Sequence, residues 1–179
     1  MLASVVVCRH YKEKVKMKIK VEELTAEAFL PFGFVGCHID PETEKIGEVP
    51  VEFYRDMVQL DLGGKAVVSF STCRVEKREL VIDVTEYHTS TGEGVLPLDN
   101  DVLIHVGPAT ADGAGAPLDK MRVFRVAKGT MVVTRPGIWH HAPFTVDENP
   151  ANVLIVLPER TYANDCVVQE IADPIVIEM

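Results

Sequence analysis

Apolar and polar residues alternate near the start of the chain with a period of two, which is typical of a half-buried strand. Val15, Met17, Ile19 and Val21 supply the apolar positions, and a lysine lies between each pair. We therefore expect a strand that turns its apolar side toward a core and its basic side toward solvent.

The pattern predicts a single helix, and that helix is short. Thr25 can accept a backbone hydrogen bond at the start of a turn over residues 26–29, and Pro31 and Gly33 then end it.

Short β-rich runs separated by turn residues fill the rest of the chain. We expect the runs at 66–70 and 80–87 to pair as a hairpin, because the turn-like residues 76–79 lie between them. Further runs lie at 94–98, 102–106, 130–134, 144–146, 153–157, 167–171 and 175–177. Residues 121–126 fit either a strand or a helical turn, and 109–117 fit a surface loop. Many short strands at this spacing favour an all-β sandwich or barrel.

Length and charge narrow the class of protein. A chain of 179 residues fits one domain, which we place at 17–179, with residues 1–16 as a possible N-terminal extension because Met17 directly precedes a strand. The net charge of -9 disfavours nucleic acid and anionic membranes as partners, and the apolar run 2–8 is too short to span a bilayer. Four cysteines lie far apart with no Cys-x-x-Cys pair, which favours reduced thiols and a cytoplasmic location.

Glu86, His88 and Glu93 form the first group that indicates chemistry. Residues two apart in a strand share a face, so Glu86 and His88 point one way and Tyr87 points the other. A short turn can bring Glu93 alongside them. Imidazole nitrogen with carboxylate oxygen is a ligand set suited to Mn, Fe, Ni, Co or Zn.

A second group follows the run 130–134, where Pro136 and Gly137 predict a tight turn. A strand that resumes at Trp139 would send His140 to one face and Trp139 and His141 to the other, and we assign His140 to the interior. A lone histidine on a β face is more often structural, and a lone glutamate is more often a solvated charge. Two groups with compatible faces favour a functional site, with or without a metal.

Candidates for binding a substrate carboxylate are Arg74, Arg135 and Arg160, because guanidinium binds carboxylate through two hydrogen bonds. Arg135 and Arg160 are the preferred two. Tyr162 is a candidate proton donor, although packing explains it equally well.

In these segments the sequence resembles the ureidoglycolate lyase family, whose members are cupins. The resemblance runs over most of the chain from Val21. It rests on the segment 24–33 (LTAEAFLPFG), the Glu86-x-His88 segment leading to 96–98, the Gly-x-Trp-His-His segment at 137–141, and the late Asp165-Cys166. It implies a cupin-type double-stranded β-helix barrel with one short N-terminal helix, and a divalent metal ion (Ni, Mn, Zn or Fe) at His88, Glu93 and His140, with no organic cofactor.

The chain departs from the family pattern at three places. The family usually has Asn-Arg or Phe-Arg where this chain has Ser71-Thr72, Gln where it has Glu93, and Tyr-His where it has Thr134-Arg135. Glu93 makes metal binding more plausible than Gln would.

The resemblance implies cleavage of ureidoglycolate to glyoxylate and urea, a step of allantoin and purine-nitrogen catabolism. In this reaction Glu86 would accept the hydroxyl proton, and Tyr162 or His141 would protonate the leaving nitrogen. Two alternatives remain: another metal-dependent cupin enzyme that acts on a small hydroxy or keto acid, and a non-catalytic cupin that binds an organic acid. We also expect a homodimer, in which apolar terminal strands such as 175–177 would suit an interface, although core packing explains them equally well.

Overall fold

The computed structural model describes residues 17–179, so the possible extension over residues 1–16 lies outside the described part of the chain. The elements in chain order are β1 (Lys18–Glu23), α1 (Ala26–Phe29), β2 (Gly33–Cys37), β3 (Lys45–Glu48), β4 (Val51–Tyr54), β5 (Val68–Val75), β6 (Val81–Tyr87), β7 (Gly94–Pro97), β8 (Val102–Val106), the 3₁₀ helix η1 (Leu118–Lys120), β9 (Arg122–Val126), β10 (Thr130–Thr134), β11 (Phe144–Thr145), β12 (Ala151–Pro158), α2 (Thr161–Asn164) and β13 (Val167–Glu178).

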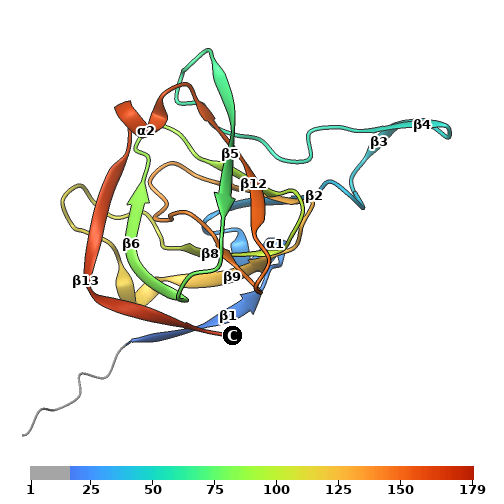
Figure 1. The fold of residues 1–179 in the computed structure, drawn as a ribbon. Helices are drawn as coiled ribbons and strands as arrows, with labels where there is room; N and C mark the ends of the chain where they lie inside the picture. The colour runs from blue at the N-terminus through green and yellow to red at the C-terminus, as the bar shows by residue number, and fades with distance from the viewer. Residues whose placement is uncertain (1–16) are drawn as a thin grey trace, which may run out of the picture.

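Two larger sheets pack against each other across an apolar core (Figure 1). One has the strand order β11-β8-β9-β1-β13-β6, and the other has the order β2-β10-β7-β12-β5. Buried side chains from both sheets meet in one cluster, including Val102 and Phe124 from the first and Val95 and Val153 from the second. The all-β, cupin-type prediction is confirmed.

Helix α1 lies where the sequence predicts it. The Thr25 hydroxyl oxygen accepts a hydrogen bond from the Ala28 amide at 3.1 Å, so Thr25 caps this single turn. Phe29 anchors the turn, because its fully buried ring packs edge-on against Phe124 with 5.6 Å between ring centroids. A second short helix, α2, was not predicted.

The predicted hairpin between runs 66–70 and 80–87 is wrong. β5 pairs with β12 along its whole length, whereas β6 pairs with β13 in the other sheet. The connection between β5 and β6 therefore crosses from one sheet to the other. Turn residues between two strands indicate only that the chain changes direction, and they do not determine which strands form hydrogen bonds.

Strand pairing decides the secondary structure of two other segments. Of the ambiguous residues 121–126, all but Met121 form strand β9, which pairs with both β1 and β8. The runs 167–171 and 175–177 belong to one strand, β13, whose register shifts between Glu170 and Ile175. Such an irregularity accommodates Pro174, which cannot donate to a regular ladder. Ile175 and Ile177 are buried in this chain's own core, so that segment does not offer the dimer interface suggested for it.

Strands β3 and β4 were not predicted, and they form a two-stranded hairpin that projects from the body of the protein (Figure 1). No helix among residues 17–179 is long and apolar enough to cross a membrane.

Candidate functional site

The end of β6 and the segment after Pro136 are held together by backbone hydrogen bonds. The Glu86 amide donates to the His140 carbonyl at 2.6 Å, and the His140 amide donates to the Glu86 carbonyl at 2.8 Å. Residues that face each other in such a pair present their side chains on the same side. On the opposite side, Tyr87 packs against Trp139 with 4.5 Å between ring centroids. The chain thus has the alternation of faces that the sequence predicts around Glu86 and His140.

Glu93 enters the site from the other sheet. Its amide donates to the Thr134 hydroxyl at 2.9 Å, and the Thr134 amide donates to the Glu93 carbonyl at 2.9 Å. These bonds hold Glu93 immediately before β7, with its carboxylate facing the two histidines.

The two imidazole rings face that carboxylate at nearly equal distances. Glu93 Oε2 lies 3.3 Å from His88 Nε2 and 3.5 Å from His140 Nε2. Burial alone would raise the pKa of Glu93, but the adjacent His140 and His88 outweigh burial and lower that pKa to about 2. Burial likewise opposes protonation of His140, and the Glu93 carboxylate outweighs it and raises the His140 pKa.

The proton positions on these histidines follow from their other nitrogens. His88 Nδ1 lies 2.6 Å from the Asp165 carbonyl oxygen, and His140 Nδ1 lies 2.7 Å from the Ile138 carbonyl oxygen. A carbonyl oxygen can only accept, so each Nδ1 carries the hydrogen and donates it. In the neutral ring, each Nε2 atom then has a lone pair that faces the Glu93 carboxylate.

Lone pairs directed at a carboxylate are stable only with a positive charge nearby, which either a proton on one ring or a metal cation supplies. His140 Nε2 is buried and has no hydrogen-bond partner among the described residues. Histidines that bind a metal commonly donate the other ring N–H to a carbonyl or carboxylate, which is the arrangement of both rings. These residues therefore fit a divalent cation.

The carboxylate of Glu86 also lies within reach of such a cation. One ligand atom each from Glu86, His88 and His140 lie within 4.8 Å of one another. The family resemblance implies proton transfer for Glu86, and metal binding for His88, Glu93 and His140. Geometry brings all four together.

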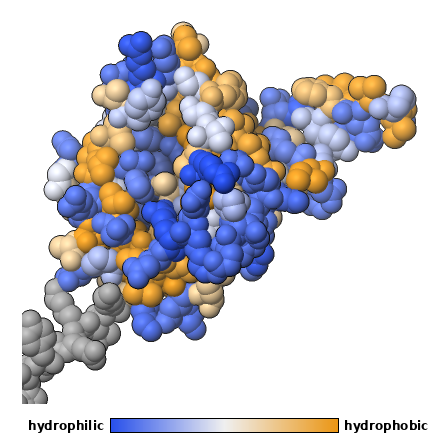
Figure 2. Space-filling model, in the orientation of Figure 1, coloured by the Kyte–Doolittle hydropathy of each residue, from blue (hydrophilic) through white to orange (hydrophobic). Residues whose placement is uncertain are grey.

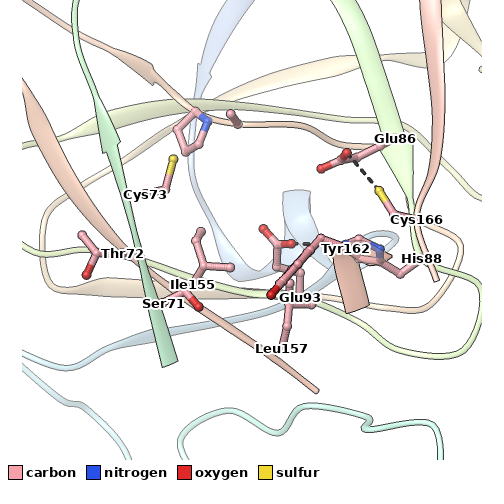
Figure 3. A pocket seen from close by; sticks show the side chains of 12 residues that line it. Ser71, Thr72, Cys73, Glu86, His88, Glu93, Ile155, Leu157, Tyr162 and Cys166 are labelled. Atoms are coloured by element: carbon pink, nitrogen blue, oxygen red, sulfur yellow. Dashed lines mark hydrogen bonds and ion pairs between the residues drawn. The ribbon is translucent and has the colours of Figure 1, made fainter. Parts of the chain in front are cut away.

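Three residues of this cluster, Glu86, His88 and Glu93, line a pocket of about 230 Å³, whereas His140 does not line it. Figure 3 shows Glu86, His88, Glu93 and Cys166 on one side of it and Ser71, Thr72 and Cys73 from β5 on the other. Tyr162 of α2 also lines it and is 75% exposed, which places this side chain at the mouth of the pocket. A small organic molecule fits a space of this size.

Cys166 contacts Glu86 directly, and sequence reasoning missed it. Its thiol donates to Glu86 Oε2 at 3.2 Å (Figure 3). Burial and this hydrogen bond raise the pKa of the Cys166 thiol to about 12, so it remains a protonated donor near neutral pH. The hydrogen bond occupies Oε2 and leaves Oε1 of Glu86 to accept a proton.

None of the three predicted arginines lines the pocket. Arg74 pairs with Glu76, Arg160 pairs with its neighbour Glu159, and Arg135 donates to the Leu30 carbonyl. All three point elsewhere because their strand or turn positions direct them outward or along the surface.

Arg78 is an arginine that contacts residues lining the pocket. The sequence does not indicate this role, because Arg78 lies among other charged residues in a turn. Its guanidinium donates to the carbonyls of Ala142 at 2.7 Å and Pro143 at 3.0 Å, and both residues line the pocket. Burial lowers the pKa of His141, so a smaller fraction of this histidine carries a proton to donate near neutral pH.

The two facing sheets, with a polar cluster of two histidines and two glutamates inside, define a cupin-type protein with a candidate metal site. The family model described as ureidoglycolate lyase matches residues 16–178, so the chain belongs to the ureidoglycolate lyase family.

Curated relatives agree with this assignment. The chain is 30% identical to a ureidoglycolate lyase of Brucella anthropi over 139 residues, covering 76% of this chain and 80% of the relative. It is 30% identical over 134 residues to one of Burkholderia cepacia, and 29% identical over 125 residues to one of Rhodobacter capsulatus. Those two alignments cover 72% and 69% of this chain, and 73% and 76% of the relatives.

Solved structures similar to part of the chain include oxalate decarboxylases. One from Bacillus subtilis matches with a TM-score of 0.41 and 17% identity, over 56% of this chain and 23% of the other. One from Lactobacillus farciminis matches with a TM-score of 0.38 and 14% identity, over 61% of this chain and 26% of the other.

Proposed function

We propose that this protein is a lyase that cleaves ureidoglycolate to glyoxylate and urea. The observation that carries the proposal is the cluster of Glu86, His88, Glu93 and His140, three of which line a pocket for a small molecule, in a chain of this family. The substrate would place the protein in allantoin and purine-nitrogen catabolism.

The reaction breaks the bond between the hydroxyl-bearing carbon and the urea nitrogen. The hydroxyl proton leaves, its electron pair forms the carbonyl of glyoxylate, and the departing nitrogen takes up a proton. A divalent ion at His88, Glu93 and His140 would supply Lewis acidity toward the substrate's hydroxyl and carboxylate.

The protein's own groups perform the two proton transfers. Glu86 accepts the hydroxyl proton on Oε1, since the Cys166 thiol already donates to Oε2. Tyr162 lies at the pocket mouth, where its hydroxyl group can protonate the departing nitrogen. The hydroxyl group of Ser71 lines the opposite wall and can donate to the substrate carboxylate, whereas none of the three predicted arginines lines the pocket.

Three cysteines in the described region, Cys37, Cys73 and Cys166, are free thiols. Free thiols support a reducing, cytoplasmic location.

The test is glyoxylate release from ureidoglycolate by purified protein, with Mn²⁺, Ni²⁺, Zn²⁺ or Fe²⁺ added back in turn. His140→Ala should reduce turnover on the order of 10³-fold while the circular dichroism spectrum remains that of the wild type. His38→Ala is the matched control, because His38 is exposed and far from the cluster in sequence. Unchanged turnover in His140→Ala would contradict the assignment.

Two other results separate the alternatives. Turnover of a different hydroxy or keto acid, without glyoxylate release, would identify another cupin reaction. An organic acid that raises the melting temperature without any turnover would identify a binding protein.

A further inference from the structure

His105 of β8 is a polar ring inside the apolar body of the protein. Apolar side chains are exposed on the hairpin of β3 and β4 (Figure 2), and His105 is the opposite departure, since this residue is only 1% exposed. Its neighbours along β8, Ile104 and Val106, belong to the hydrophobic core. Burial and, to a smaller extent, the charge of His140 lower the pKa of His105 to about 3, so the ring is neutral near neutral pH. The proposed reaction does not use this ring.

A chain of two hydrogen bonds connects His105 to the candidate site. His105 Nε2 lies 3.2 Å from the Thr85 hydroxyl oxygen, and this oxygen lies 3.2 Å from the carbonyl oxygen of His140. Thr85 precedes Glu86 on β6, so its side chain lies on the opposite side of the strand from the Glu86 carboxylate. The connection therefore reaches His140 from behind the site, through the backbone.

The position of the hydrogen on the His105 ring follows from what its neighbours can donate and accept. The His140 carbonyl oxygen can only accept, so the single hydroxyl hydrogen of Thr85 is donated to it. The Thr85 oxygen then accepts from His105 Nε2–H, and His105 Nδ1, which has no partner among the described residues, keeps a lone pair. With the hydrogen on Nδ1 instead, a buried donor would be unpaired, and the Nε2 lone pair would compete with His140 for the Thr85 hydrogen. The Nε2–H form is therefore favoured.

The Thr85 hydroxyl adds a further constraint to the backbone of His140. The amide and the carbonyl of His140 already pair with Glu86, at 2.8 Å and 2.6 Å. A carbonyl oxygen has two lone pairs, and the Thr85 hydroxyl occupies the second. The place of His140 Nε2, which faces Glu93, depends on this backbone.

We propose that His105 is a positioning residue for His140: it orients the Thr85 hydroxyl, and this hydroxyl fixes the peptide from which the His140 ring extends. For metal affinity the inference rests on the divalent ion proposed at this site, because a metal site tolerates only small displacements of a ligand atom. Loss of the hydrogen bonds that support a metal ligand typically weakens metal binding by about 10- to 100-fold.

The affinity of the purified full-length chain for Zn²⁺, measured by titration calorimetry, tests the proposal. Thr85→Val removes the hydroxyl and keeps the branched shape, and it should weaken Zn²⁺ binding about tenfold. Thr85→Ser keeps the hydroxyl and should bind Zn²⁺ as the wild type does. Thr145→Val is the matched control and should also leave the affinity unchanged, because the hydroxyl of the buried Thr145 donates to the Asp147 carbonyl, outside the cluster.

His105→Leu should weaken Zn²⁺ binding about as much as Thr85→Val, and His105→Gln, which keeps an N–H donor, should recover most of the affinity. Because His105 acts through Thr85, the double variant Thr85→Val/His105→Leu should bind no more weakly than Thr85→Val. Circular dichroism and thermal unfolding establish that each variant is folded. Unchanged affinity in folded Thr85→Val, or additive losses in the double variant, would overturn the proposal.

NMR spectra of the histidine rings in the metal-free protein provide a readout that is independent of metal and of turnover. His105 should carry its hydrogen on Nε2, and the His140 ring signals should shift in Thr85→Val and His105→Leu but not in Thr145→Val. A hydrogen on His105 Nδ1, or His140 signals that do not move, would contradict the positioning role. If the wild type binds no divalent ion, the proposed metal site is wrong, and these spectra alone decide the role of His105.

Discussion

At the scale of single residues, Glu93 decides what the candidate site can hold. Its carboxylate faces two Nε2 atoms whose rings already donate their Nδ1 hydrogens to carbonyl oxygens. A cation at this position is stabilised by the carboxylate charge as well as by the two lone pairs. Gln, which the ureidoglycolate lyase family usually has here, would supply an oxygen without the charge.

Glu93→Gln should therefore bind divalent ions less tightly, by about tenfold or more, with the fold unchanged. Titration calorimetry with Mn²⁺ and Zn²⁺, and metal analysis after dialysis, measure the effect. Glu23→Gln is the control, because it removes the same charge from an exposed position on β1. Equal affinity in the wild type and Glu93→Gln would show that Glu93 does not contact the ion.

At the scale of elements, Asp165 connects the end of α2 to the segment after β6. Its carboxylate accepts hydrogen bonds from the amides and hydroxyls of Thr89 and Ser90, and its carbonyl accepts from His88. Burial opposes ionisation, but the hydrogen bonds from Ser90 and Thr89 outweigh it and hold the pKa of Asp165 well below its usual range. The same contact that orients His88 thus contributes to stability.

The lowered pKa determines how the contribution of Asp165 to stability changes with pH. A carboxyl group whose pKa is lower in the folded state stabilises the fold above its unfolded pKa of about 3.9, and the contribution is lost as the pH falls toward the folded value. Asp165→Asn should lower the free energy of unfolding at pH 7 by about 1 kcal/mol, because solvent partly screens the interactions of this partly exposed carboxylate. The melting temperature should fall by about 3 °C. The difference from the wild type should shrink as the pH falls below about 4.

Thermal unfolding from neutral pH to pH 3 measures this difference, with Asp40→Asn as an exposed control. A difference that stays constant over the whole range would mean that the ionised carboxylate is not what stabilises this connection.

At the scale of the whole molecule, stability depends on the core between the two larger sheets. Phe124 of β9 is fully buried, and its ring contacts those of Phe29 and Phe32, with centroids 5.6 Å and 6.1 Å away. It joins the N-terminal segment to the six-stranded sheet. Loss of this ring leaves a cavity that the surrounding strands cannot fill.

Phe124→Ala should lower the free energy of unfolding by about 4 kcal/mol. Urea denaturation measures the loss. Leu30→Ala provides the comparison, since Leu30 is 56% exposed and its truncation should change stability little. A small effect of Phe124→Ala would mean that the ring lies outside the cooperative core.

The sequence by itself determined the local features of this protein. Alternation along a strand placed Glu86 and His88 on one side and Tyr87 on the other, and Thr25 identified the start of α1, because these properties depend on a few neighbouring residues. Tertiary structure alone decided that β5 pairs with β12 and that Cys166 returns to Glu86. It also directed the three predicted arginines away from the pocket and left the hairpin of β3 and β4 projecting from the body. Those outcomes depend on which distant strands pair and in what register, and turn residues and hydrophobic periodicity carry no information about that choice.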